Sequence, residues 1–185
     1  KKTSLWKDGA KRKKKKIMIE DLVDYDPDTG KLTWNQHLWR TTIEVGDAVG
    51  GVCTTLSGHR QVCYKGKYIY THRLCWKKYY GVWPEQDLDH IDGDPLNNKI
   101  NNLRLCNKQQ NRANSKTKKL YKGVVKTFRK NHPWKAQIKC NDKLVHLGVF
   151  KTEIEAARAY DVAAKEFFGE FASPNFKDNN NVNIL

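Results

Sequence analysis

Hydrophobic and polar residues alternate along several short stretches of the chain, a pattern typical of β-strands with one buried face. It predicts strands at 31–34, 60–64 and 67–71, the last two joined by a hairpin turn at Lys65 and Gly66. Hydrophobic residues at helical spacing predict a helix over 72–81 that ends at Gly81, and a short amphipathic helix over 17–25. The first part of the chain is therefore expected to be α+β.

A second unit of strand, loop, strand and helix is predicted after this helix. Strands are expected around 88–91 and 103–106, on either side of a polar loop. Asn107 followed three residues later by Gln110 is a capping box, so a helix should begin at Lys108 and carry Asn111 in its first turns.

The C-terminal part predicts a three-stranded antiparallel sheet packed on one helix. Its strands are expected at 121–128, 134–140 and 143–150, and its helix from Thr152 to Gly169. The predicted inward face of this helix comprises Ile154, Ala157, Tyr160, Ala164 and either Phe167 or Phe168. The expected organisation is an arm at 1–16, a domain at 17–115, a linker at 116–120, a domain at 121–177 and a polar tail at 178–185.

The positive charge of the chain is concentrated in two regions. The formal net charge is +15: residues 1–16 carry +8 and residues 112–150 carry +10, whereas residues 17–111 carry −1 and residues 151–185 carry −2. Such a distribution favours a polyanionic partner, because each phosphate that is neutralised releases condensed counterions. Residues 1–16 are expected to be a flexible basic arm. The arm either binds nucleic acid or is not native, since the chain lacks an initial Met and Met18 follows.

We expect neither a membrane-spanning segment nor disulfide bonds. No apolar run approaches the 18 residues of a membrane span, and no signal peptide follows the basic start, so we expect no membrane partner and a cytoplasmic location. The five cysteines form no C-x-x-C pair, and they are expected to be reduced and mostly buried: Cys53, Cys63, Cys75, Cys106 and Cys140.

Residues 87–98, DLDHIDGDPLNN, place four aspartates around one histidine. An EF-hand loop is excluded, because Gly93 at its sixth position leaves no late bidentate Glu. The simplest explanation is a turn. Alternatively, Asp and Asn oxygens suit Mg²⁺, and an adjacent imidazole suits a general base. Asp89 and His90 would point to opposite faces of a regular strand, so joint action requires a bulge or a strand end.

Residues 70–111 resemble the HNH endonuclease family in its phage and intron-encoded homing form. The resemblance depends on the spaced elements HRL, DHIDGD, NN and NNLRL and on a downstream Asn. It implies a ββα-metal fold with one divalent ion, Mg²⁺ or Mn²⁺. It also implies that His90 is the general base, that Asn102 orients the hairpin and the base, and that Asp89 and Asn111 bind the metal. One such site would nick one DNA strand.

Three further residues are candidates for accessory roles. His72, at the start of its helix, is either a structural histidine or a neighbour of the site, as the HRL elements of the family imply. Arg104 and Arg112 either contact phosphate or face solvent.

Residues 121–176 resemble the ethylene-response-factor (Apetala) DNA-binding domain. The resemblance covers YKGVVKTF, WKAQIK and the helix EAARAYDVAA, with a terminal Asn-Phe pair. It implies that a face of the sheet binds DNA. Lys in place of Arg lacks the bidentate fork for guanine, so these positions predict phosphate binding more than base reading. The expected DNA-binding set is Lys122, Lys126, Arg129, Trp134, Lys135, Gln137, Lys139 and His146.

Together these features predict an α+β protein in which a ββα-metal nuclease module precedes a three-stranded DNA-binding module. The expected function is metal-dependent cleavage of double-stranded DNA by a monomer or weak dimer, in a bacterial or phage-infected cell. One alternative is a non-catalytic DNA-binding transcriptional regulator. Another is a protein that binds or cleaves RNA, because charge alone does not distinguish the two sugars.

Overall fold

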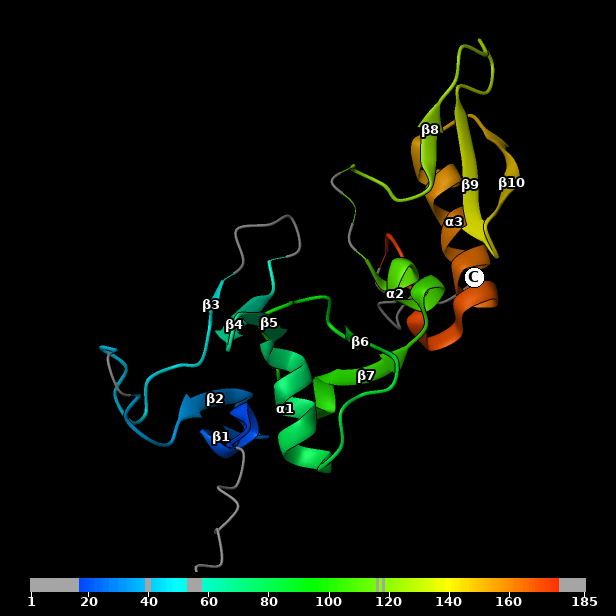
Figure 1. Ribbon diagram of the computed structural model, residues 1–185. Coiled ribbons are helices and arrows are strands. Elements are labelled where there is room, and N and C mark those ends of the chain that lie inside the picture. The colour runs from blue at the N-terminus through cyan, green and yellow to red at the C-terminus, as the bar shows by residue number, and fades with distance from the viewer. Residues whose placement is uncertain (1–16, 39–40, 53–57, 116, 118, 177–185) are drawn as a thin grey trace, which may run out of the picture.

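The computed structural model describes residues 17–38, 41–52, 58–115, 117 and 119–176 of the 185-residue chain. It has the predicted mixed class, with helices and small antiparallel sheets in two units that meet at helix α2 (Figure 1). The predicted arm, the polar tail, Cys53 and part of the linker lie outside the described residues.

The described part of the chain begins with a single 3-10 turn, η1 (Ile19–Asp21), and the hairpin β1 (Val23–Asp26) and β2 (Lys31–Trp34). The helix predicted over 17–25 is therefore wrong. The Asp21 carboxylate accepts a hydrogen bond from the Met18 amide and closes the turn. Val23 is then fully buried and pairs with Trp34 across the hairpin, which gives the next residues an alternating, strand-like burial.

A second sheet and helix α1 follow. The sheet consists of β3 (Gly51–Val52), β4 (Arg60–Tyr64) and β5 (Lys67–Tyr70), and α1 spans Thr71–Tyr80. The predicted turn between β4 and β5 is confirmed, with Lys65 at φ 50° and Gly66 at φ 76°. Gly81 ends α1 in the left-handed conformation, at φ 75°. Leu74 and Cys75 of α1 are fully buried in a core with Val23, Trp34 and Val62.

The predicted strand, loop, strand and helix are confirmed. They are β6 (Asp87–His90), β7 (Leu103–Cys106), which pairs antiparallel with β6, and α2 (Lys108–Asn114). The loop between the strands includes the short turn η2 (Ile100–Asn102). The Asn107 and Gln110 side chains form the predicted capping box.

The C-terminal unit is the predicted three-stranded sheet with one helix. Its strands are β8 (Val124–Lys126), β9 (Trp134–Cys140) and β10 (Lys143–Phe150), in the order β10-β9-β8. Helix α3 (Glu153–Phe168) lies along one face of this sheet and is followed by η3 (Gly169–Phe171) (Figure 1). Ala157, Tyr160, Ala164 and Phe168 face inward as predicted, whereas Ile154 is 49% exposed, and Ala156 and Ala163 are buried in addition.

The two units share part of a hydrophobic core. Cys106 of β7 and Ala113 of α2 pack with Ile138, Tyr160, Phe168 and neighbouring residues of the second unit. Polar contacts support this junction: the Gln109 side chain accepts a hydrogen bond from the Asn141 amide and donates one to the Cys140 sulfur. Helix α2 therefore belongs structurally to both units.

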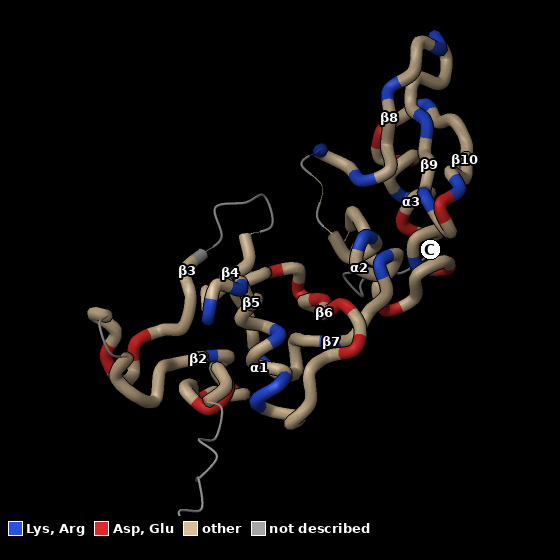
Figure 2. The backbone as a smooth tube through the Cα atoms, in the orientation of Figure 1, with Lys and Arg blue, Asp and Glu red and all other residues tan. Residues whose placement is uncertain are grey.

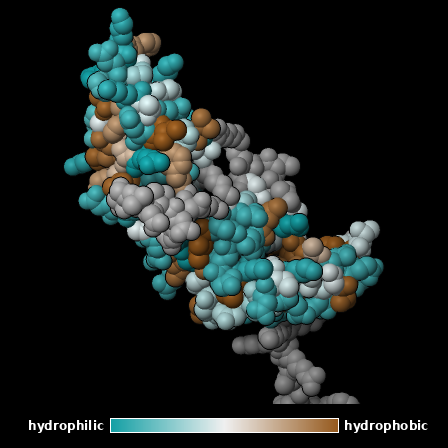
Figure 3. Space-filling model, turned by 180° about the vertical axis from the view of Figure 1, so that it is seen from behind, coloured by the Kyte–Doolittle hydropathy of each residue, from teal (hydrophilic) through white to brown (hydrophobic). Residues whose placement is uncertain are grey.

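The surface is largely polar. Hydrophilic residues cover most of the rear face, and hydrophobic ones occur in small groups between them (Figure 3). Within the described residues, no helix combines the length and apolar character needed to cross a bilayer. Of the four cysteines described, all are free, and Cys75 and Cys106 are buried as expected, whereas Cys63 is exposed.

Candidate active site and nucleic-acid interface

Asp89 and His90 lie at the last two positions of β6 and are both buried, at 6% and 4% exposure. The strand ends at His90, where the Gly93 amide donates to the His90 carbonyl and the chain turns. This is the strand end that joint action of the two side chains requires.

The Asp89 carboxylate is held by Arg104 and by Asn114. Arg104 Nε donates to Asp89 Oδ2 at 3.0 Å, and Nη2 lies 2.9 Å from the same oxygen as an ion pair. Asn114 Nδ2 lies 3.0 Å from each carboxylate oxygen and also donates to the His90 carbonyl at 2.7 Å. The Arg104 side chain is therefore mostly buried in an ion pair with Asp89, which corrects the alternative that it faces solvent.

Asn114 was missed by sequence reasoning, which selected Asn111 from the same helix. The two residues are three positions apart, so they lie on neighbouring parts of one helix face. Asn111 is partly buried, and Asn114 is 7% exposed and is the one in contact with Asp89. The signal that could have identified Asn114 is the helical spacing of the two asparagines.

Asn102 braces the loop that follows His90. Its Oδ1 accepts from the Asp92 amide at 3.1 Å, and its Nδ2 donates to Asp92 Oδ1 at 3.0 Å and to the Asn97 carbonyl at 2.8 Å. Burial alone would raise the pKa of Asp92, but hydrogen bonds from Asp94, Asn97 and Asn102 outweigh it and lower that pKa. Asn102 thus holds together the two sides of the loop that follows His90.

Three imidazoles, those of His59, His72 and His90, gather in one cluster. The ring centroid of His72 lies 5.3 Å from that of His90 and 4.9 Å from that of His59, and His59 lies 5.4 Å from His90. Burial, together with His90 and His59, lowers the pKa of His72 to about 3, so this ring is neutral near pH 7. His72 is thus a neighbour of the site, and no motif in the sequence identified His59.

The His90 ring is oriented by Asn98, another residue that the sequence left unassigned. His90 Nε2 lies 3.0 Å from Asn98 Oδ1, and Asn98 is 5% exposed. Across the described part of the chain, no group of three or more His, Cys, Asp and Glu side chains has a geometry suited to a metal ion. A metal at this site would therefore depend on Asp89 together with amide oxygens.

Four of the eight predicted DNA-binding residues lie on one face of the sheet. Lys135, Gln137 and Lys139 alternate with buried Ala136 and Ile138, so they point away from α3, and His146 pairs with Gln137 on this open face. Lysines and arginines are distributed along β8, β9 and β10, and acidic residues lie around β6 (Figure 2). This open face is the part of the predicted set that the structure brings together.

Four predicted residues lie elsewhere. Trp134 packs on the helix side with Ala156 and Ala157, and Lys126 pairs with it across the strands. Lys126 and Trp134 point to the same side of the sheet as buried Ala136. They therefore lie on the helix side of the sheet and not on its open face. Arg129 is exposed in the loop between β8 and β9.

Lys122, the fourth, is directed into the protein instead of toward a partner. Its ammonium group donates to the carbonyls of Arg112, Ala113 and Ser115 at the C-terminal end of α2, at 3.4, 2.5 and 2.7 Å. Burial lowers the pKa of Lys122 to about 8. These contacts add donors for carbonyl groups at the end of the helix, where intrahelical amide donors run out; the Arg112 carbonyl also accepts from the Ser115 amide.

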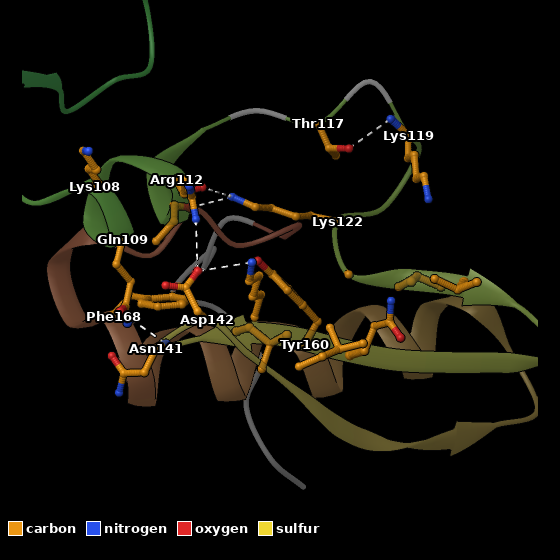
Figure 4. A pocket seen from close by; sticks show the side chains of 18 of the residues that line it. Lys108, Gln109, Arg112, Thr117, Lys119, Lys122, Asn141, Asp142, Tyr160 and Phe168 are labelled. Atoms are coloured by element: carbon orange, nitrogen blue, oxygen red, sulfur yellow. Dashed lines mark hydrogen bonds and ion pairs between the residues drawn. The ribbon is translucent and has the colours of Figure 1, made fainter.

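A cavity of about 740 Å³ lies at the junction, between α2, the linker and one end of the sheet (Figure 4). Its basic residues come from both units, and Arg112 and Lys139 lie 3.5 and 3.2 Å from the exposed Asp142 carboxylate. The cavity is continuous with the open face through Gln137 and Lys139.

Residues 69–113 match the family model described as HNH endonuclease. The chain is also similar to an uncharacterized HNH endonuclease, L560, of Acanthamoeba polyphaga mimivirus, with 43% identity over 88 residues, which cover 48% of this chain and 46% of that protein.

The C-terminal part is similar to plant proteins of the AP2/ERF type. The transcription factor RAV1 of Arabidopsis thaliana, named as containing AP2/ERF and B3 domains, is 52% identical over 58 residues, which cover 31% of this chain and 16% of RAV1. APETALA2-like protein 2 of Oryza sativa subsp. japonica is 44% identical over 59 residues, which cover 31% and 13%. The matched regions therefore span less than half the length of each relative, and the chain combines a segment similar to HNH endonucleases with a segment similar to AP2/ERF proteins.

Proposed function

We propose that this protein is a metal-dependent endonuclease that hydrolyses phosphodiester bonds of double-stranded DNA. The observation that carries the proposal is the position of His90. It is buried at the end of β6, next to Asp89 in the chain, within the ββα unit that matches the HNH model. The resemblance of the C-terminal unit to DNA-binding domains supports DNA as the substrate.

His90 is proposed as the general base that takes a proton from water. An imidazole suits this step because its two nitrogens can hold and accept a proton near neutral pH. Burial of His90 and the hydrogen bond at its Nε2 restrict the ring to one orientation. Asn102 supports the step by bracing the loop that follows His90.

The proposed metal ligands fit a hard divalent ion. Asp89 Oδ1 accepts a hydrogen bond from Asn114, and a carboxylate oxygen has more than one lone pair, so it can also bind a cation. Asp89 and Asn111 offer a carboxylate and an amide oxygen, the ligand type that Mg²⁺ and Mn²⁺ prefer. A bound ion would polarise the phosphate and stabilise the leaving 3′ oxygen.

The open face of the sheet is proposed to bind the DNA backbone. Lys135 and Lys139 can reach phosphates, whereas Gln137 and His146 can also approach base edges. Basic residues of the junction cavity extend this surface toward α2, whose other side contacts Asp89. With one proposed site per chain, a monomer would nick one strand.

The competing function is that of a DNA-binding regulator with an inactive nuclease unit, which the AP2-like domain alone would also support. The buried arrangement around His90 favours the enzyme, because a scaffold does not require a histidine, a carboxylate and polar partners at one strand end. RNA as the target is a second alternative, which direct competition between RNA and duplex DNA would distinguish.

The experiment is cleavage of supercoiled plasmid DNA in Mg²⁺ or Mn²⁺ by the wild-type chain and by His90→Ala. We expect metal-dependent nicking by the wild type and a loss of roughly 100-fold or more in the variant, because general-base catalysis contributes about 10²–10⁴-fold. DNA binding, measured by gel shift, should be retained. Wild-type protein that binds DNA but leaves it intact in both metals would support the regulator instead.

A further inference from the structure

We propose that Asn98 is a positioning residue that fixes the tautomer of His90, so that Nε2 carries the proton and Nδ1 presents the lone pair to water. This inference rests on the proposed function and extends it by assigning the reactive nitrogen. It depends on a chain of hydrogen bonds that runs from β4 through α1 to the His90 ring.

The direction of this chain follows from the donors and acceptors that each group offers. The Thr71 hydroxyl donates its only hydrogen to the Arg60 carbonyl at 3.3 Å. Thr71 Oγ1 is then left as an acceptor, and Asn98 Nδ2 donates to it at 3.4 Å. The amide of Asn98 is thereby oriented with its oxygen toward His90.

An amide oxygen accepts hydrogen bonds and has none to give. The contact of 3.0 Å between Asn98 Oδ1 and His90 Nε2 therefore requires a proton on Nε2. In a neutral imidazole the lone pair then resides on Nδ1. All three side chains are buried, at 2% exposure for Thr71, 5% for Asn98 and 4% for His90, so water does not substitute for these bonds.

The backbone of Asn98 is held by the N-terminal hairpin, which precedes the segment that matches the HNH model. The Tyr25 hydroxyl donates to the Asn98 carbonyl at 2.7 Å. Gly30 lies so close that a Cβ there would be 2.7 Å from the Asn98 carbonyl carbon. The hairpin of β1 and β2 thus holds in place the loop that orients the base.

The test uses the full chain and a readout that needs no activity. Nitrogen-15 NMR of the histidine side chains, with the His90 signals identified by their absence in His90→Ala, measures the tautomer directly. We expect Nε2–H for wild-type His90. Asn98→Ala should remove this preference, and Thr71→Val should weaken it while Thr71→Ser restores it, because serine keeps the hydroxyl acceptor.

Cleavage assays supply the second readout. Asn98→Ala should lower the rate constant at saturating DNA by roughly 10-fold or more without changing DNA affinity. Asn101→Ala is the matched control, since this asparagine of the same loop is exposed.

The inference is overturned if His90 carries its proton on Nδ1, or if its tautomer is the same in Asn98→Ala as in the wild type. A decrease of activity in Asn98→Ala with unaltered His90 signals would also overturn it, since the residue would then act only on stability. Failure of the proposed function is distinct, because it would appear as full cleavage by His90→Ala, whatever the NMR spectra show.

Discussion

The buried imidazole of His72 illustrates how single residues couple this site to stability. In the folded protein its pKa falls from 6.5 to about 3, first because of burial and then because of His90 and His59. Between these two pH values the unfolded chain binds a proton that the folded chain does not. The neutral His72 therefore contributes fully to the free energy of unfolding above pH 6.5. This contribution declines as the pH falls below 6.5, by at most about 1.4 kcal/mol per pH unit.

This predicts a specific effect of His72→Gln, since glutamine takes up no proton. When the pH is lowered from 7 to 5, the free energy of unfolding should decrease more in the wild type than in the variant. The difference between the two decreases should be up to about 2 kcal/mol. Urea unfolding at the two pH values measures the difference. Equal decreases in both proteins would show that His72 is protonated in the folded state.

Sequence reasoning at the residue scale was accurate for local features and incomplete for long-range contacts. The motif placed Asp89, His90 and Asn102 at one strand end and its loop, because their positions depend on a short hairpin. It gave no role to Asn98 or Asn114, and none to His59. Their contacts with His90 and Asp89 arise only when separate elements pack together.

At the scale of elements, α2 shows what sequence patterns reveal and what they omit. Its start was predicted from the capping box of Asn107 and Gln110, a contact between residues three apart. Its end is completed by Lys122 of the second unit, which sequence reasoning assigned to DNA. Likewise, the hydrophobic spacing over 17–25 fits a short helix, but pairing of Val23 with Trp34 favours a strand.

Lys122→Met tests the contact at the end of α2. Methionine keeps the aliphatic stem but lacks the ammonium that donates to three carbonyls. We expect the free energy of unfolding to fall by about 1–3 kcal/mol. Lys126→Met, at an exposed position, should change it by less than about 0.5 kcal/mol. Equal effects in chemical denaturation would argue against the α2 contact.

At the scale of the whole molecule, the two units are joined through the site itself. Arg104 pairs with Asp89, donates from Nη1 to the Glu170 carbonyl at 2.9 Å, and stacks 3.9 Å from the Phe171 ring centroid. Cys106 and Ala113 share a core with the second unit. The sequence predicted two modules with a linker, and it could not show this junction because the contacts are specific to the docked pair.

The central claim is that the unit containing His90 cleaves DNA and that the C-terminal unit provides the affinity for DNA. Single-turnover cleavage of duplex DNA, with protein in excess, measures the cleavage step separately from binding. The account predicts that Lys135→Ala combined with Lys139→Ala weakens binding. The slope of log affinity against log salt concentration should also become shallower, by about 0.9 for each phosphate that is no longer neutralised. His90→Ala should instead retain affinity and be defective in the cleavage step. Cleavage by His90→Ala at the wild-type rate would contradict the account.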